Sequence, residues 1–263
     1  MGNFITSIKV NHIFHLENFC IPISENEKKH LIITGKNGSG KTILLNAIVE
    51  HLSKVCNDKT LSFLDYEKHL ESCRTRLQQY KVVGDSQKII SNQDSIELYK
   101  TWIEEVYGKV ELSFHDIYSI SKDFFSQNFI IAYYADERKS LFVEPKNPVK
   151  PDLKMKTDLK HNKVDQFLNF MVDCKVQEAL ARNEGKTEDA DYIRQWFVGF
   201  RNILRQIFDD TTLELDFNYK DYSFLIQTRG KSFKFTELSA GYSAALDIVA
   251  DLILKMQSQN NVV

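Results

Sequence analysis

The chain has 263 residues, of which 43% are hydrophobic, and its formal net charge is only −2. This length suits one large domain with an inserted lobe better than two equal domains. The small net charge excludes a strong overall attraction to nucleic acid, so any contact with DNA has to be local.

Cysteine usage and the N-terminus indicate the compartment. The four cysteines are far apart and form no C-x-x-C pair, which argues against a zinc site or a disulfide framework and for a reducing environment. The N-terminus has no basic segment followed by a long apolar region, and no stretch approaches the roughly 18 apolar residues of a membrane span. We therefore expect a soluble, cytoplasmic protein with no membrane partner.

The first part of the chain has the composition of strands. We predict three of them, broken at Asn11-His12 and by a polar loop, at residues 4–10, 13–23 and 30–34. This small N-terminal β-subdomain leads directly into a glycine-rich segment.

The glycine-rich segment is a complete G-x-x-x-x-G-K-[ST] phosphate-binding loop. It lies between the apolar run 31–33, predicted to be a buried strand, and an apolar-striped helix that starts near Lys41. Glycines allow successive backbone N–H groups to point inward around phosphates, and the helix start adds its positive dipole end. The predicted nucleotide-binding residues are Gly35, Lys36, Asn37, Gly38, Ser39, Gly40, Lys41 and Thr42.

Two residues of the loop have specific chemical roles in this pattern. Lys41 is expected to reach the β- and γ-phosphates, and the Thr42 hydroxyl is expected to bind Mg²⁺. The sequence therefore predicts ATP and Mg²⁺ as cofactors.

The middle of the chain is predominantly helical. Apolar spacing predicts helical runs at 44–80 and 94–107, and alternation predicts a strand at 110–114. An apolar, aromatic run at 129–134 predicts another buried strand. Three prolines within 145–151 favour an extended linker, which marks a lobe boundary.

Beyond the linker, apolar stripes on either side of Gly185 predict a helical hairpin, and alternating residues predict strands at 213–219 and 222–226. The predicted layout has three parts. They are a β-subdomain with the phosphate loop at 1–56, a helical lobe at 57–210 that includes a strand at 128–137 and the linker at 145–151, and a C-terminal segment at 211–263.

The C-terminal segment carries Leu238-Ser239-Ala240-Gly241 at the start of an apolar-striped helix. Its place downstream of the phosphate loop and beyond a helical insertion resembles the signature motif of ABC-class ATPases. Ser239 offers a hydroxyl and Gly241 an unobstructed N–H at a helix N-terminus, which suits a γ-phosphate. A polar N-cap before a core helix is the simpler alternative.

The resemblance implies an α/β fold, namely an ABC-type ATPase head with an N-terminal antiparallel β-subdomain and an inserted helical lobe. In that family the signature of one subunit closes on the nucleotide held by the phosphate loop of the other. It therefore also implies an ATP-sandwiched homodimer or a higher even oligomer. Ala240 and Tyr242 depart from the usual Gly and Gln or Glu of the motif.

Within this class, the phosphate loop, the opening strand pair and the helical insertion resemble the SMC, RecF and OLD branch of DNA-handling ATPases. Residues 237–253 are most similar to the PtuA-type ATPases of bacterial anti-phage systems, including Septu and retron-associated ones. Such ATPases are generally encoded beside an HNH nuclease. The resemblance thus implies an HNH-type nuclease partner and, in a retron complex, contact with DNA, msDNA or RNA.

ATP hydrolysis in this class needs four apolar residues followed by Asp-Glu, and no such segment follows the signature. We therefore expect these residues to be the N-terminal portion of a longer ATPase. Alternatively, the run 129–134 followed by Asp136 and Glu137 supplies the motif, with Asp136 at the metal and Glu137 catalytic. The later signature and the proline linker favour the ABC order, in which this strand leads into the Q-loop region.

Two further features have open alternatives. Residues 138–163 hold a local excess of lysines, which could follow a phosphate backbone or form a solvated linker. Phe14 could stack on adenine, as aromatic residues near the first strands do in related ATPases, or lie in the core.

Three functions are consistent with these features. The first is an ATPase that dimerises around ATP and regulates a nuclease in anti-phage defence. The second is a DNA repair or recombination ATPase, and the third is a nucleotide-gated scaffold without appreciable turnover.

Overall fold

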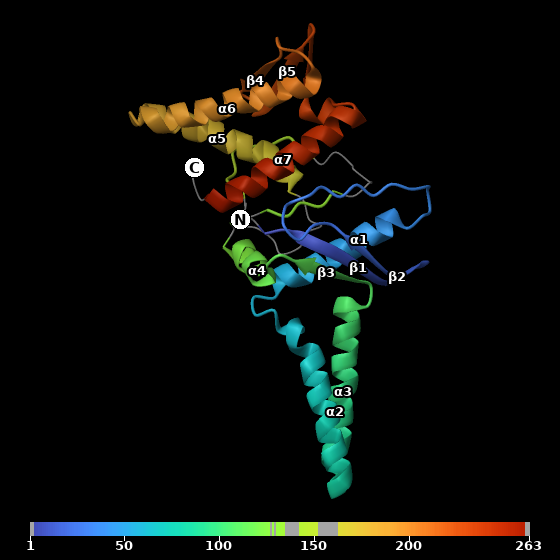
Figure 1. Cartoon of the computed structure of the whole chain (residues 1–263). Coiled ribbons are helices and arrows are strands. Elements are labelled where there is room, and N and C mark those ends of the chain that lie inside the picture. The colour runs from blue at the N-terminus through green and yellow to red at the C-terminus, as the bar shows by residue number, and fades with distance from the viewer. Residues whose placement is uncertain (1–2, 127, 129, 135–141, 152–162, 261–263) are drawn as a thin grey trace. The chain divides into compact units, whose positions relative to one another are not determined.

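The computed structural model describes residues 3–126, 128, 130–134, 142–151 and 163–260, with side chains to residue 257. The fold is mixed α/β, and its strands form two three-stranded antiparallel sheets. The chain divides into two compact units, Met1–Phe129 and Ile130–Val263, called unit 1 and unit 2 below (Figure 1). The predicted α/β class is confirmed at this level, and the division falls within the range predicted as the helical lobe.

The sheet of unit 1 has the order β2-β1-β3 and contains β1 (Ile5–Ile13), β2 (Leu16–Pro22) and β3 (Val110–Phe114). The predicted break at Asn11-His12 is wrong, because β1 continues through both residues. His12 pairs across the ladder with Glu17, and its Nδ1 lies 3.0 Å from the Glu17 carboxylate. The turn instead lies at Phe14-His15, where Phe14 has a positive φ of 54°.

Helix α1 (Lys41–Asn57) packs on this sheet, and its N-terminal end brings the phosphate loop next to the β1–β2 turn. A single apolar face of α1 packs against inward-pointing strand residues. The buried cluster contains Leu44, Ala47, Ile48, Ile8, Val10, Ile13, Val110 and Leu112. Burial of this stripe fixes the helix, and therefore its N-terminus, on the sheet.

The strand predicted before the phosphate loop is absent. Residues 31–33 are in no strand, and Ile32 is 83% exposed. A β-branched run forms a ladder only where neighbouring strands offer backbone partners. No strand in the described part of the chain pairs with this run, so its composition alone does not produce a buried strand.

The helix predicted over 44–80 is interrupted. Asp58 accepts hydrogen bonds from the backbone and hydroxyl groups of Thr60 and Ser62, and Leu61 has a positive φ of 51°. This turn leads into a short 3-10 helix (Ser62–Asp65) and then into α2 (Tyr66–Val83). Local side-chain hydrogen bonds thus end α1 where apolar spacing predicted a continuous helix.

Helices α2 and α3 (Ser86–Tyr107) form a long antiparallel hairpin (Figure 1). The α3 helix begins before the predicted residue 94, because the Asp85 carboxylate caps it by accepting from the Lys88 backbone N–H at 3.2 Å. Only Leu70, Cys73 and Ile96 form the fully buried apolar core of the hairpin. Unit 1 also contains α4 (Ile117–Phe125).

Unit 2 contains the predicted helical hairpin, formed by α5 (Phe167–Asn183) and α6 (Thr187–Phe208) after a 3-10 turn (Val164–Gln166). The predicted strands are present as β4 (Glu214–Asn218) and β5 (Ser223–Thr228). A further strand, β6 (Lys231–Lys234), follows a turn in which Arg229 and Gly230 both have positive φ. A 3-10 turn (Phe235–Glu237) then leads to α7 (Ala240–Asn260).

The core of unit 2 is dense and aromatic. Phe167, Phe200 and Phe235 are each at most 2% exposed, and their rings contact one another in edge or stacked geometries. Leu246, Ala250 and Leu254 bury one face of α7 in the same cluster. This packing fixes the start of α7 relative to the sheet and the α5–α6 hairpin.

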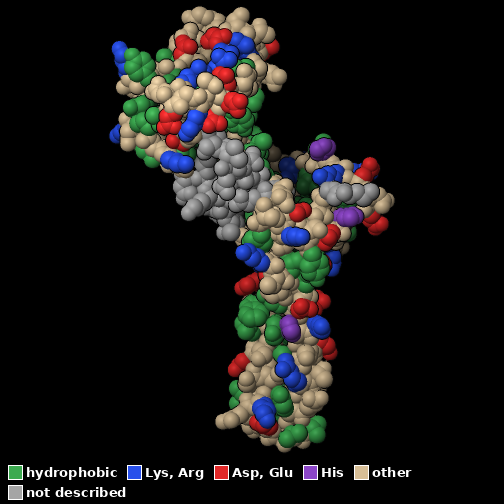
Figure 2. Space-filling model, turned by 90° about the vertical axis from the view of Figure 1, so that its left-hand side faces the viewer, with side chains coloured by type: hydrophobic (Ala, Val, Ile, Leu, Met, Phe, Trp, Pro, Cys, Tyr) green, Lys and Arg blue, Asp and Glu red, His purple; other side chains and the backbone are tan. Residues whose placement is uncertain are grey.

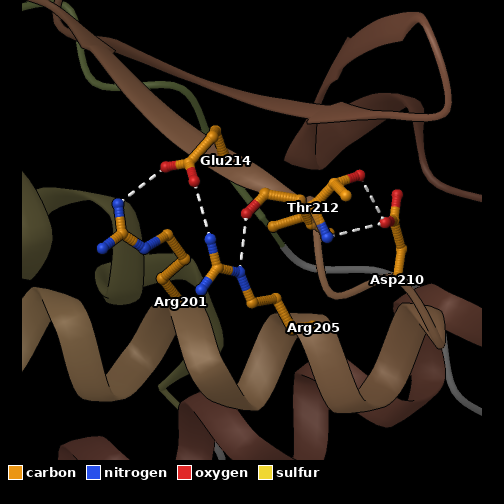
Figure 3. Close-up of polar contacts among 6 residues, drawn as sticks. Arg201, Arg205, Asp210, Thr212 and Glu214 are labelled. Carbon is orange, nitrogen blue, oxygen red and sulfur yellow. Dashed lines mark hydrogen bonds and ion pairs between the residues drawn. The ribbon is translucent and has the colours of Figure 1, made fainter.

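Polar contacts also join α6 to the β4 strand (Figure 3). Glu214 accepts from Arg201 at 2.7 Å and from Arg205 at 2.6 Å, while Arg205 Nε donates to the Leu213 carbonyl at 2.9 Å. Nearby, hydrogen bonds from Thr228 and Thr212 lower the pKa of Asp210 to about 2.

The strand predicted at 128–137 is also absent from the residues that are described there, 128 and 130–134. No described strand pairs with them. Instead, the Tyr134 hydroxyl donates to Asp251 of α7 at 2.9 Å. Tyr134, at least, is thus attached to α7 of unit 2 by its side chain.

The cysteines and the apolar helices were two further subjects of the sequence analysis. All four cysteines are free thiols, as their spacing suggested. Among the described helices, none combines the length and the apolar character that crossing a bilayer requires.

Candidate nucleotide site

The phosphate loop is a compact turn that ends at the N-terminus of α1. Gly40 is the N-cap with a φ of 89°, and its carbonyl accepts the first helical hydrogen bond from the Leu44 N–H at 2.8 Å. A Cβ on Gly35 would lie 2.8 Å from the Ser39 hydroxyl oxygen, so a larger residue where the two ends of the loop meet would require the Ser39 side chain to move. The sequence motif thus folds into a closed loop with its backbone at a helix start.

Lys41 folds back across this loop. Its ammonium group donates to the carbonyl oxygens of Gly35 and Lys36, each at 2.8 Å. The amine is therefore held within the loop by two neutral acceptors. A phosphate oxygen is a stronger acceptor for an ammonium group than a carbonyl, so the same amine can exchange these bonds for contacts to a bound anion.

The electrostatic surroundings of the α1 N-terminus favour an anion. The first turn of α1 contains no acidic residue, and Lys36 and Lys41 both belong to the loop. The N–H groups that point out of the first turn of a helix and the positive end of the helix dipole add to this field. Thr42 lies in the same first turn and is exposed, as a hydroxyl that binds Mg²⁺ beside a phosphate has to be.

The β1–β2 turn lies against the end of the phosphate loop. A Cβ on Gly40 would be 3.2 Å from Leu16 and 3.6 Å from His15, so these side chains touch the loop directly. Phe14 is 70% exposed and its ring meets the His15 ring edge-on at 5.1 Å. This exposure excludes the alternative of a core position for Phe14 and leaves an aromatic face open beside the loop.

The signature residues lie at the start of α7 in unit 2. Ser239 and Gly241 are exposed, and the Ser243 N–H donates to the Ser239 carbonyl at 2.9 Å. Nothing lies within 4 Å of a Cβ placed on Gly241, so the backbone there is open. The Tyr242 ring stacks on Phe208 of α6 at 4.2 Å and anchors this end of the helix.

The structure therefore brings the predicted residues together in two groups. Residues 35–42 form one loop in unit 1, and Ser239 and Gly241 form one helix start in unit 2. The weaker candidates Asp136 and Glu137 lie outside the described residues.

A polar stripe along α7 was not predicted from the sequence. Ser243, Asp247 and Asp251 follow one another at intervals of one turn and are 5%, 8% and 1% exposed. Asp251 accepts from Tyr134 at 2.9 Å and from Lys255 at 2.6 Å. The sequence feature that could have predicted this stripe is the i, i+4 spacing of these polar residues in an otherwise apolar helix.

The described part of the chain holds no cluster of metal-ligating side chains, and the face drawn in Figure 2 shows no large basic surface. Among the described residues there is no group of three or more His, Cys, Asp or Glu side chains arranged around one point. Acidic and basic side chains are interspersed on the face drawn in Figure 2. Of the lysine-rich segment 138–163, the exposed Lys146 and Lys150 and the partly buried Lys163 are described, whereas residues 138–141 and 152–162 are not.

Comparisons with protein-family models, curated proteins and solved structures give no match for this chain.

Proposed function

We propose that the chain is the ATP-binding and ATPase subunit of a bacterial anti-phage system, which dimerises around ATP and regulates a partner nuclease. The observation that carries this proposal is the closed loop at residues 35–42, set at the N-terminus of α1 with the Lys41 amine held inside it. The anti-phage role and the HNH-type partner rest on the sequence resemblance.

In this proposal the triphosphate binds where backbone N–H groups and the dipole of α1 converge. Lys41 leaves the carbonyls of Gly35 and Lys36 and binds the β- and γ-phosphates, while Thr42 coordinates Mg²⁺. The exposed Phe14 ring, beside Gly40 through its neighbour His15, provides a surface for the adenine base.

The signature closes the site from a second copy of the chain. The exposed Ser239 hydroxyl and the open backbone at Gly241 form an anion-binding helix start that suits the γ-phosphate. Because each copy carries one loop and one signature, two copies enclose two nucleotides. Hydrolysis then needs a carboxylate pair to hold Mg²⁺ and to polarise water, and in the alternative to the ABC order Asp136 and Glu137 are the candidates for this pair.

The test is the molar mass of the purified chain by light scattering after gel filtration, with and without Mg²⁺-ATP. The proposal predicts that ATP converts monomer into dimer, and that Lys41→Ala and Ser239→Ala each prevent this. Ser232→Ala, an exposed serine on β6, is the matched control and should dimerise normally. A mass that is unchanged by ATP in the wild-type chain would rule out the sandwich.

The nuclease role is tested separately. If a gene for an HNH protein lies beside this one, co-expression of the two proteins should give a complex whose DNA cleavage changes when ATP is removed or when Lys41 is replaced by Ala. If DNA cleavage by the Lys41→Ala complex responded to ATP as it does in the wild-type complex, regulation through this site would be contradicted. A repair ATPase or a nucleotide-gated scaffold would then be the better description.

A further inference from the structure

The C-terminal turn of α3 is capped from outside the hairpin, and the carbonyl groups of residues 104–107 all have partners. A helix leaves the carbonyl groups of its final turn without intrahelical donors, and in α3 these begin at residue 105, because the N–H of the cap residue Gly108 still bonds to residue 104. The Glu104 carbonyl accepts from the Gly108 N–H at 2.8 Å. The other three accept from side chains: Glu105 from Lys54, Val106 from His51 at 3.0 Å, and Tyr107 from Asn11 at 2.6 Å.

Two of these three donors belong to α1, the helix that begins at the phosphate loop. His51 lies ten residues after Lys41, about 15 Å along the helix at 1.5 Å per residue, and Lys54 lies one turn further. The third donor, Asn11, belongs to β1, and its backbone N–H also donates to the Lys109 carbonyl at 3.0 Å. The base of the hairpin is thus attached directly to the helix that carries the candidate nucleotide site.

The contacts at the base of the hairpin also require one protonation state of His51. Because a carbonyl can only accept, the His51 Nδ1 must carry the proton, and burial lowers the pKa of His51 so that the ring stays neutral. Glu111 and Lys54 are the charged groups acting on the ring, and Tyr107 lies against it with a centroid distance of 5.7 Å. Close by, Glu50 of α1 pairs with Lys109 at 2.8 Å.

We propose that His51, Lys54 and Asn11 are positioning residues that couple the α2–α3 hairpin to the phosphate loop, so that nucleotide binding tightens the hairpin base and an ordered hairpin raises nucleotide affinity. This inference rests on the proposed ATP binding and names a regulation of that site. In this proposal the order of the α2–α3 hairpin depends on whether a nucleotide is bound to unit 1.

The physical basis is that a bound phosphate changes the contacts at one end of α1 while the caps hold its other half. In this proposal the first turn of α1 shifts when Lys41 exchanges the Gly35 and Lys36 carbonyls for phosphate oxygens. A helix transmits such a shift along its axis, and the three caps end on a hairpin whose own apolar core is small. By thermodynamic linkage, the free energy by which bound nucleotide stabilises the hairpin base equals the free energy by which an ordered base strengthens nucleotide binding.

The test combines ATP affinity with hydrogen–deuterium exchange of residues 104–111, both measured on the purified chain. His51→Leu removes the donor, and His51→Asn restores an N–H donor at the position of Nδ1. Ser53→Ala is the control, because the Ser53 hydroxyl bonds only within α1. Lys54→Met and Asn11→Ala remove the other two caps, and circular dichroism melts check the folding of every variant.

We expect ATP to slow exchange of residues 104–111 in the wild-type chain and in Ser53→Ala. His51→Leu should weaken ATP binding about fivefold or more and abolish the slowing, and His51→Asn should recover most of both effects. If His51→Leu does not fold, Lys54→Met and Asn11→Ala are judged by the same two readouts. Wild-type binding of ATP without any change in exchange at the base would overturn the coupling and leave the proposed function intact. Absence of ATP binding would remove both.

Discussion

The two helical hairpins of the chain, α2–α3 and α5–α6, have similar helix lengths but are stabilised differently. The α5–α6 hairpin packs into an aromatic core with α7 and the sheet of unit 2. The α2–α3 hairpin buries only Leu70, Cys73 and Ile96 fully, and at its end Val82 and Val83 are 87% and 76% exposed. One hairpin is thus part of a large core, whereas the other has a small core of its own and is also held at its base by α1 and β1.

This difference assigns the hairpins different roles. A helix pair inside a dense core opens only when the core opens, so α5–α6 serves as a rigid support for the start of α7. A pair with few buried contacts opens locally at low cost, which makes its order sensitive to the caps at residues 105–107. The following predictions test this contrast, beginning with the largest expected effect.

Truncating the aromatic core should damage α5–α6 most. Phe200→Ala removes a side chain that is 2% exposed and contacts Phe167 and Phe235, so we expect a loss of about 3–5 kcal/mol in the free energy of unfolding. Urea denaturation followed by circular dichroism measures this loss. Leu70→Ala, on the other hairpin, should cost clearly less, and an equal or larger cost would contradict the contrast.

Breaking the arginine clamp should cost less than the core truncation. Glu214→Ala leaves Arg201 and Arg205 facing each other without their shared carboxylate, and we expect a loss of about 1–2 kcal/mol, since Glu214 is half-exposed. The same denaturation experiment measures it. Glu97→Ala, which removes an exposed pair with Lys100, is the control and should change stability by less than about 0.5 kcal/mol.

The hairpin base should be sensitive to pH near neutrality. Burial lowers the folded-state pKa of His51 below its usual 6.5, so the unfolded chain takes up this proton at a higher pH than the folded chain does. Stability is therefore complete above about pH 6.5 and falls as the pH drops through that value toward the folded-state pKa. Thermal melts between pH 8 and pH 5 should show this fall.

A variant identifies the group responsible for that fall. In His51→Asn the cap remains but cannot titrate, so the loss of stability between pH 6.5 and 5 should become smaller. The carboxyl groups with lowered pKa, among them Asp58 and Asp210, lose their contribution only at lower pH. An unchanged profile in His51→Asn would mean that another group causes the loss.

The smallest effect is expected at the tip of the α2–α3 hairpin. Val82→Lys replaces an 87% exposed side chain, so the free energy of unfolding should change by no more than about 0.5 kcal/mol. A loss of 2 kcal/mol or more by urea denaturation would show that the tip is packed in solution, and the description of α2–α3 as a thinly packed pair would then be wrong.

Features set by short stretches of sequence were predictable. The phosphate loop is defined by eight consecutive residues, and its closure on the start of α1 follows from their types. The α5–α6 hairpin was predicted from apolar spacing and from Gly185, whose φ of 74° ends the first helix.

Features that depend on distant partners were not predictable in the same way. The run 31–33 has strand composition but lacks a pairing strand among the described residues, and composition cannot report on partners. The caps on α3 join residues that lie 96, 55 and 51 positions apart. Asn11 was therefore interpreted as a strand break, although its side chain and backbone hold the base of the hairpin.

The central claim is that residues 35–42 bind a nucleoside triphosphate, and calorimetric titration of Mg²⁺-ATP into the purified chain tests it most directly. Lys41→Ala is compared with Lys36→Ala, which removes a second lysine from the same loop but leaves its backbone carbonyl. We predict saturable binding in the wild-type chain, a loss of affinity of at least tenfold in Lys41→Ala, and a change of less than about threefold in Lys36→Ala. Absence of binding in the wild-type chain, or equal affinity in Lys41→Ala, would contradict the claim.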